Sequence, residues 1–148
     1  EFMAGIRDAL HAPVLPSTAY PFLLISGARR LASYNTWTHN IPALMDKMKG
    51  NWATMHPDDA ADLGIRDGDR IQVSSAVGSL EIGVVLSADV RRGVVAIHQF
   101  WGHVYDSGTR TSRRHPGVNV NLLHDDRVRD RFSGMPVFNG TPCHVAAV

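Results

Sequence analysis

The chain is nearly devoid of cysteine, with Cys143 alone among 148 residues. One cysteine excludes an intrachain disulfide and any four-cysteine zinc or iron–sulfur site, and it fits a reducing cytoplasm. Long apolar runs are also absent, and none approaches the roughly 20 residues that a membrane span needs. Arg7 and Asp8 interrupt the start of the chain, where a secretory signal would be apolar. We therefore expect a cytoplasmic protein with no membrane insertion.

The chain also lacks an excess of charge of either sign. Its 15 basic and 14 acidic residues leave a formal net charge of +1, which gives no general attraction to nucleic acid or to a membrane surface. A cluster of arginines lies in the last third of the chain: Arg110, Arg113, Arg114, Arg127, Arg129 and Arg131. Because Asp125, Asp126 and Asp130 interrupt its second half, we interpret the cluster as a solvated surface and expect no nucleic-acid partner.

Glycine and proline are plentiful, with 13 and 8 residues, and they predict many turns between short elements. We expect residues 1–19 to be an irregular lead-in or linker that begins with a two-residue cloning scar, and residues 20–148 to be one domain. Short apolar or alternating runs predict strands over residues 22–25, 70–75, 80–86, 94–100 and 144–148. The connection at 74–79 reads as a hairpin, with Gly78 available for a positive φ. Together these elements predict a mainly β fold with short helices, arranged as a small barrel.

The stretch from Asn51 to Ser75 has the clearest local signals. His56 can cap a short helix with Pro57 at its first position, where the missing N–H costs nothing. Gly64 supplies a left-handed residue that ends this helix. The sequence Asp67-Gly68-Asp69 then predicts a tight turn before the strand at 70–75. Since the unit has little room for chemistry, we expect its acidic side chains to cap and turn the chain.

Three polar segments follow predicted strands and could converge at one end of a barrel. The first comprises Gly27, Arg29 and Arg30 with Tyr34, Asn35 and Thr36. An arginine pair with a hydroxyl and backbone N–H groups is the donor set that a pyrophosphate needs. A solvated loop with incidental arginines is the alternative.

The second segment runs from His98 through Trp101 and Gly102 to His103. Tryptophan and histidine can stack on a flat heterocycle, and glycine lets the backbone approach a ligand closely. A core aromatic residue with two hydrogen-bonded histidines is the alternative. We expect no metal site, because an open zinc site needs three protein ligands and no third is evident.

The third segment holds Asn119 and Asn121, which would share one face of an alternating strand. Their amide groups match the donor–acceptor edge of a pterin or guanine ring. The alternative is that these asparagines cap turns.

Taken in order, these segments resemble the C-terminal molybdopterin-dinucleotide-binding domain of the molybdenum and tungsten oxidoreductases related to dimethyl sulfoxide reductase, formate dehydrogenase and nitrate reductase. The resemblance runs from about Pro21 to Val148. It rests on the stretch from His56 to Val73, on the first polar segment, and on Asn121-Leu122 with Ser133-Gly134, Pro136 and Phe138.

The resemblance implies a double-psi β-barrel that binds molybdopterin guanine dinucleotide. It implies that Arg29, Asn35 and Thr36 meet the phosphates or nucleotide, and that the loop at 101–103 and Asn121 approach the pterin. It also implies that the metal is held by other domains or by a large subunit, so we expect no redox turnover by this chain alone and assign no catalytic residue. A stand-alone barrel that binds a protein or substrate remains the main alternative, and a barrel that cleaves itself at Gly78-Ser79 is a minor one.

Overall fold

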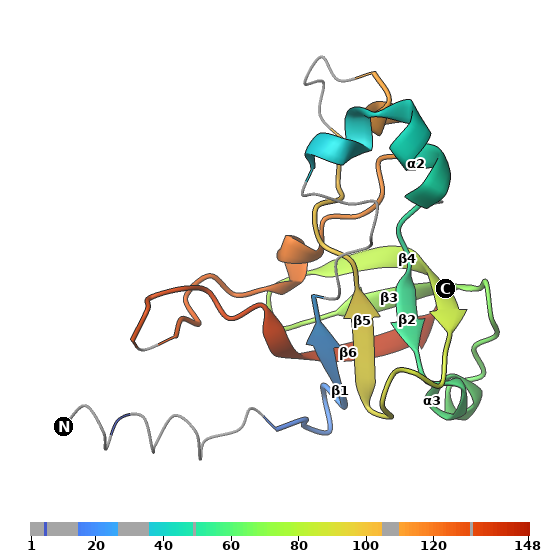
Figure 1. Ribbon diagram of the computed structural model, residues 1–148. Coiled ribbons are helices and arrows are strands. Elements are labelled where there is room, and N and C mark those ends of the chain that lie inside the picture. The colour runs from blue at the N-terminus through green and yellow to red at the C-terminus, as the bar shows by residue number, and fades with distance from the viewer. Residues whose placement is uncertain (1–4, 6–14, 27–35, 49, 105–109, 131) are drawn as a thin grey trace.

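The computed structural model describes residues 15–26, 36–48, 50–104, 110–130 and 132–148, together with residue 5. Within these residues, six strands close into a barrel in the spatial order β1-β5-β2-β4-β3-β6 (Figure 1). The strands are β1 (Phe22–Ile25), β2 (Ala53–Met55), β3 (Arg70–Ser74), β4 (Ser79–Leu86), β5 (Val94–Ile97) and β6 (Asn139–Ala147). The helices are α2 (Pro42–Met48) and α3 (Pro57–Asp62), with 3₁₀ turns η1 (Trp37–Asn40), η2 (Ser112–Arg114) and η3 (Val120–Leu123).

Two parallel strand pairs define the topology of the barrel. β1 pairs in parallel with β5, and β2 pairs in parallel with β4, whereas every other neighbouring pair is antiparallel. β5 lies between β1 and β2, and β2 lies between β4 and β5, so the connection from β1 to β2 and the connection from β4 to β5 each pass over one intervening strand at one end of the barrel. The fold is a double-psi β-barrel, as predicted.

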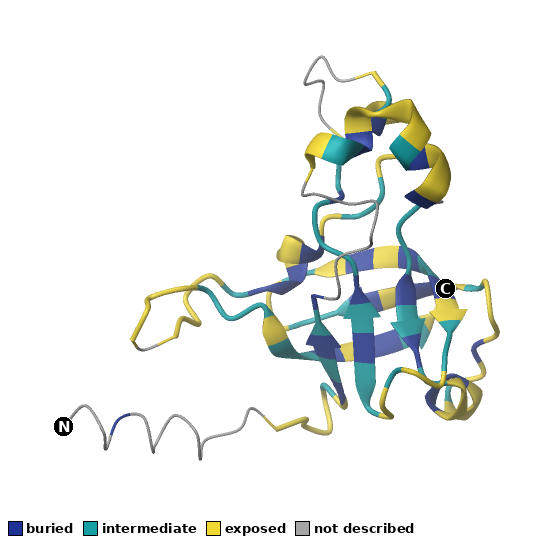
Figure 2. Cartoon of the chain, in the orientation of Figure 1, coloured by how far each residue is buried: buried dark blue, intermediate teal, exposed yellow. Residues whose placement is uncertain are grey.

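The barrel interior holds the main core. Alternate residues of β3 and β4 point inward, and Ile71, Val73, Ile82 and Val84 are almost fully buried. Figure 2 shows the same alternation as dark blue and yellow bands along the strands. This period of two is the pattern from which both strands were predicted. A second, smaller cluster of Met45, Met48 and Trp101 lies outside the barrel.

The strong local signals of the stretch 51–75 are confirmed. His56 accepts a hydrogen bond from the Asp58 backbone N–H at 3.1 Å and caps α3, which begins at Pro57. Gly64 has φ +70°. The turn acids act on the backbone, because the Asp67 carboxylate accepts the Leu86 N–H and that of Asp69 accepts the Arg66 N–H. These carboxylates stabilise turns, as expected.

The structure differs from the sequence predictions at several places, among them β6, which begins at Asn139 rather than near His144. β2 was not predicted, although Ala53 and Met55 are fully buried. β5 ends at Ile97, so the segment from His98 to Phe100 leaves the barrel earlier than predicted. Asn119 and Asn121 do not lie on a strand, because residues 120–123 form the 3₁₀ turn η3.

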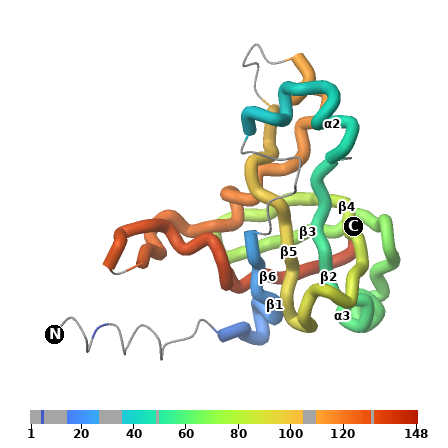
Figure 3. The backbone as a smooth tube through the Cα atoms, viewed as in Figure 1, coloured from blue at the N-terminus to red at the C-terminus, as the bar shows by residue number. Residues whose placement is uncertain are grey.

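A helical extension stands on one end of the barrel. α2 lies there, and the chain that leaves β5 rises beside α2 and returns toward the barrel (Figure 3). A hydrogen bond from the Thr111 N–H to the Asn40 side chain at 2.9 Å joins the two parts of the extension. α3 lies at the opposite end of the barrel (Figure 1). Among the helices of the described ranges, none is long and apolar enough to cross a membrane.

Candidate functional site

A pocket of about 420 Å³ lies where the helical extension meets the barrel. Polar and aromatic side chains line it together: Thr36, Gln99, Phe100, Trp101, Gly102, His103, Asn119, Asn121 and Phe138. They come from the N-terminus of η1, the segment after β5, the start of η3 and the residue before β6. The second and third polar segments predicted from the sequence therefore share one pocket, and Thr36 joins them from the first.

The strand directions explain why residues so far apart in sequence meet here. β1 and β5 are parallel, so their C-terminal ends lie at the same end of the barrel. β6 is antiparallel to β1, so its N-terminal end lies there too. Ser26, which follows β1, donates its backbone N–H to the Asn139 side chain at 3.0 Å, which confirms the arrangement.

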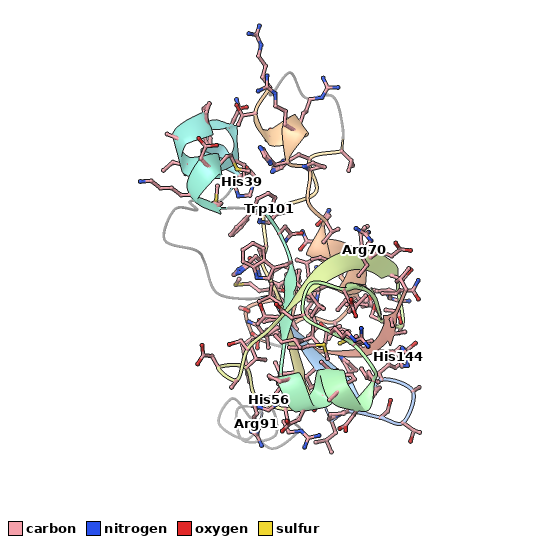
Figure 4. The ribbon with its side chains drawn as sticks, turned by 90° about the vertical axis from the view of Figure 1, so that its right-hand side faces the viewer. His39, His56, Arg70, Arg91, Trp101 and His144 are labelled. Atoms are coloured by element: carbon pink, nitrogen blue, oxygen red, sulfur yellow. The ribbon has the colours of Figure 1, made fainter. Side chains whose placement is uncertain are left out.

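Trp101 and His39 form a buried stack beneath the pocket. Trp101 is 7% exposed and packs on Met45 and Met48, and its ring centroid lies 4.3 Å from that of the fully buried His39. Figure 4 shows the two side chains together at the base of the extension. Gly117 also packs against the Trp101 indole, since a Cβ on Gly117 would lie 2.7 Å from that ring. The Trp101 ring therefore packs in a small core cluster and also lines the pocket.

A histidine pair links this stack to the pocket. His39 Nδ1 lies 2.7 Å from His103 Nε2, and the two rings meet edge to face with centroids 5.0 Å apart. Burial, together with repulsion from a charged His103, lowers the pKa of His39 to about 4. Burial also lowers the pKa of His103. At neutral pH both rings are uncharged, so one donates the shared hydrogen bond and the other accepts it.

Gly102 and Asn119 approach each other closely at the pocket that both line. Gly102 has φ +106°, and a Cβ on it would lie 2.6 Å from the Asn119 Cβ. The Asn119 side chain accepts the Asn121 N–H at 3.1 Å and caps η3. Asn119 therefore caps a turn while it lines the pocket, and the shared-strand prediction is wrong because its side chain bonds a local backbone N–H. The Asn121 side chain is exposed at the pocket.

Two features at or near the pocket had no signal in the sequence. Phe100 has φ +76°, a conformation that a bulky residue seldom adopts and that often marks a functional site. Asn51 bridges two loops, because its amide donates to the His98 carbonyl at 3.2 Å and accepts the Val118 N–H at 2.8 Å. His39 was also missed, since an isolated histidine after a polar loop shows no periodicity.

Behind the pocket, Ser26 and His124 form a buried polar network. Ser26 Oγ donates to the Phe138 carbonyl at 2.7 Å and lies 2.6 Å from His124 Nε2, while His124 Nδ1 lies 2.8 Å from the Thr141 hydroxyl. Since the serine hydrogen is committed to a carbonyl, His124 Nε2 must donate to Ser26. The histidine then cannot act as a base toward Ser26. The network is structural and ties β1, η3 and β6 together.

The predicted arginine segment cannot be compared with the pocket. Gly27, Arg29, Arg30, Tyr34 and Asn35 lie outside the described residues. For the metal, the described part of the chain holds no group of three or more His, Cys, Asp or Glu residues arranged to bind an ion. Cys143 is buried, and burial raises the pKa of its thiol to about 12, as befits a structural residue.

Curated relatives with similar sequences are large oxidoreductase chains. The chain is 28% identical to a tetrathionate reductase chain of Archaeoglobus fulgidus over 102 residues, which cover 66% of this chain and 8% of the relative. It is 32% identical to the molybdopterin-containing ArrA chain of the arsenate respiratory reductase of Chrysiogenes arsenatis over 136 residues, or 82% of this chain and 16% of the relative. It is also 32% identical over 83 residues to the alpha chain of the F420-dependent formate dehydrogenase of Methanocaldococcus jannaschii. This match covers 55% of this chain and 12% of the relative. The chain thus spans less than a fifth of each of these relatives.

A solved structure shows the same fold. Acetylene hydratase from Pelobacter acetylenicus superposes with a TM-score of 0.77 at 20% identity, over 93% of this chain and 21% of that one. The family model of the molydopterin dinucleotide binding domain matches residues 22–142, which include every strand start of the barrel and the whole pocket. The chain therefore belongs to the molybdopterin-dinucleotide-binding domain family of the molybdenum and tungsten oxidoreductases.

Proposed function

We propose that the pocket between the extension and the barrel binds the pterin end of molybdopterin guanine dinucleotide. The observation that carries the proposal is the convergence of Thr36, His103 and Asn121 in one pocket, from three segments that the family match covers. A hydroxyl, a neutral imidazole and an amide supply both donors and acceptors. That combination suits the mixed edge of a pterin or guanine better than it suits a phosphate.

The size of the pocket supports binding of one part of the cofactor. A cavity of about 420 Å³ is within the usual range for small-ligand sites, but a dinucleotide extends beyond it. We place the phosphates toward residues 27–35, because Thr36 lies in the pocket and that segment directly precedes it. Arg29, Arg30 and Asn35 would supply the charge-assisted hydrogen bonds there, with Gly27 and Tyr34 beside them.

We infer that this domain works inside a larger oxidoreductase, either as one of its domains or as a small subunit. The relatives are six or more times longer than the matched segment, and the described residues offer no cluster for a metal. The bound group would supply electron transfer at molybdenum or tungsten, with the metal ligand and substrate pocket formed by the large subunit or the remaining domains. Our expectation for the parent remains a formate dehydrogenase-like or nitrate reductase-like enzyme in the cytoplasm.

The test is cofactor retention in the enzyme that carries this domain. Arg29→Ala and Asn121→Ala should each lower the molybdenum or tungsten content and the pterin content of the purified enzyme, because each removes a direct contact. Metal is measured by mass spectrometry and pterin by the fluorescence of its oxidised form.

Matched controls separate a lost contact from a general effect of truncation. Arg91→Ala removes an exposed arginine at the far end of the barrel (Figure 4), and Gln72→Ala removes an exposed amide on β3. Both controls should keep full cofactor content. Unchanged metal and pterin in both site variants would refute the assignment.

A further inference from the structure

The His39–His103 pair has a geometry that suits the control of one side chain by another. His103 lies on the pocket wall, whereas His39 is fully buried and does not line the pocket. The two rings join through a single hydrogen bond of 2.7 Å between Nδ1 of His39 and Nε2 of His103. His39 can therefore influence a ligand in the pocket only through a neighbour.

The backbone of His103 is already fixed without His39. The N–H groups of Gly102 and His103 both donate to the Pro116 carbonyl, at 2.7 and 2.9 Å. What remains free is the rotation of the His103 side chain. Among the residues that the structure describes, His39 is the one that hydrogen-bonds this ring, so it selects the orientation of the ring.

His39 itself has little freedom. Its ring lies 4.3 Å from the indole of Trp101 at an interplanar angle of 37°, and Trp101 is held between Gly117 and the methionines of α2. A ring confined in this way is a rigid support. Rigid support matters because a binding group must be held within about 0.5 Å of its productive position.

We propose that His39 is a positioning residue that holds the His103 ring in the orientation in which it hydrogen-bonds the heterocyclic part of the bound cofactor. The proposal rests on the proposed function, since His103 needs a ligand in the pocket to act on. It adds a residue that touches no ligand and that lies outside the predicted binding set.

Two nearly isosteric substitutions test this role. His39→Asn retains a hydrogen-bonding group near the position of Nδ1, whereas His39→Leu fills a similar volume with none. Both variants lose the ring that packs on Trp101. If His39 mattered only for packing, Leu would be at least as good as Asn, because an amide is costly to bury.

We expect the enzyme carrying His39→Leu to lose cofactor about three- to tenfold faster than wild type on dilution. This is the fold-change that corresponds to the free energy of one ordinary hydrogen bond. For His39→Asn, the increase in the logarithm of the release rate should be at most half of that for His39→Leu. Release is followed by pterin fluorescence, which needs no turnover. The pair His144→Asn and His144→Leu, on the exposed side of β6, should leave the rate unchanged.

A double-mutant cycle completes the test. In a His103→Ala background, His39→Leu should cause little further loss, because the ring that His39 orients is gone. Equal rates for Asn and Leu at position 39, or an undiminished effect of His39→Leu without His103, would overturn the proposal. If Asn121→Ala still releases cofactor faster in the same assay, the proposed function stands while the role of His39 falls.

Discussion

The contact between Gly78 and η3 gives a sharp prediction about how the barrel holds the end that carries the pocket. Gly78 has no positive φ, contrary to the hairpin prediction. Instead, a Cβ on it would lie 2.3 Å from the Leu122 carbonyl oxygen. Glycine is required here for close approach of two backbones rather than for a left-handed turn.

The size of the effect of Gly78→Ala follows from this geometry. The two backbones must separate by about 0.7 Å before the contact reaches 3.0 Å, below which real Cβ atoms are essentially never found. The Cβ is fixed to the backbone of residue 78 and the Leu122 oxygen is a backbone carbonyl, so neither atom can move away by rotation of a side chain. Overpacking of this kind costs about 1–3 kcal/mol, which for a chain of this length lowers the melting temperature by about 3–9 °C.

The assay compares Gly78→Ala with Gly83→Ala by thermal unfolding, followed by circular dichroism. Gly83 lies in β4, its φ is not positive, and a Cβ on it would meet nothing within 4 Å. We expect the control to be neutral or up to about 1 kcal/mol more stable, because alanine restricts the unfolded chain. Equal melting temperatures for the two variants would refute the steric argument.

Three further predictions concern charge and burial. Asp59→Asn should cost about 1–3 kcal/mol in urea unfolding, because the 8%-exposed carboxylate accepts both the Gly93 N–H at 2.6 Å and the Arg92 Nε–H at 3.0 Å, and an amide has only one oxygen to accept them. Asp62→Asn, at an exposed position, should cost under about 1 kcal/mol. The free energy of unfolding should fall by about 1–3 kcal/mol as pH drops from 6.5 toward 4. In this range the histidine is protonated in the unfolded chain, whereas buried His39, with its pKa of about 4, stays neutral in the folded chain. His39→Asn should flatten that dependence, and an unchanged slope would contradict it. Cys143 should resist iodoacetamide at pH 8 until the chain is unfolded, because its pKa is about 12; rapid native labelling would show that the thiol is accessible.

Much of the fold could be predicted because local chemistry and tertiary structure agree there. In β4 the alternation of Leu80, Ile82 and Val84 matches their burial. In α3 the cap, the proline and the final glycine all match the observed helix. β2 escaped prediction since a strand of three residues, Ala53–Met55, is too short to show a period.

The candidate site could be predicted only in part, for a different physical reason. Trp101 and His103 stand close together in sequence and both line the pocket, yet the Trp101 ring also packs in the smaller core cluster, whereas His103 does not. No composition or spacing distinguishes the two. From the sequence, Asn119 could equally cap a turn or lie on a strand and present its amide to a heterocycle. Which of the two local structures forms depends on whether the chain turns there. His39 acquires its position only when η1 packs against the segment after β5, 64 residues away.

The position of Asn121 shows how the barrel can fix a pocket residue that is itself exposed. η3 is a single 3₁₀ turn, too short to be stable alone. It is held at its start by Gly102 against Asn119 and at Leu122 by Gly78. At its C-terminal end His124 joins the buried network of Ser26, which anchors the turn to β1 and β6. Because these contacts come from separate parts of the barrel, a change at Gly78, remote in sequence from the pocket, should move Asn121 and weaken cofactor retention along with stability.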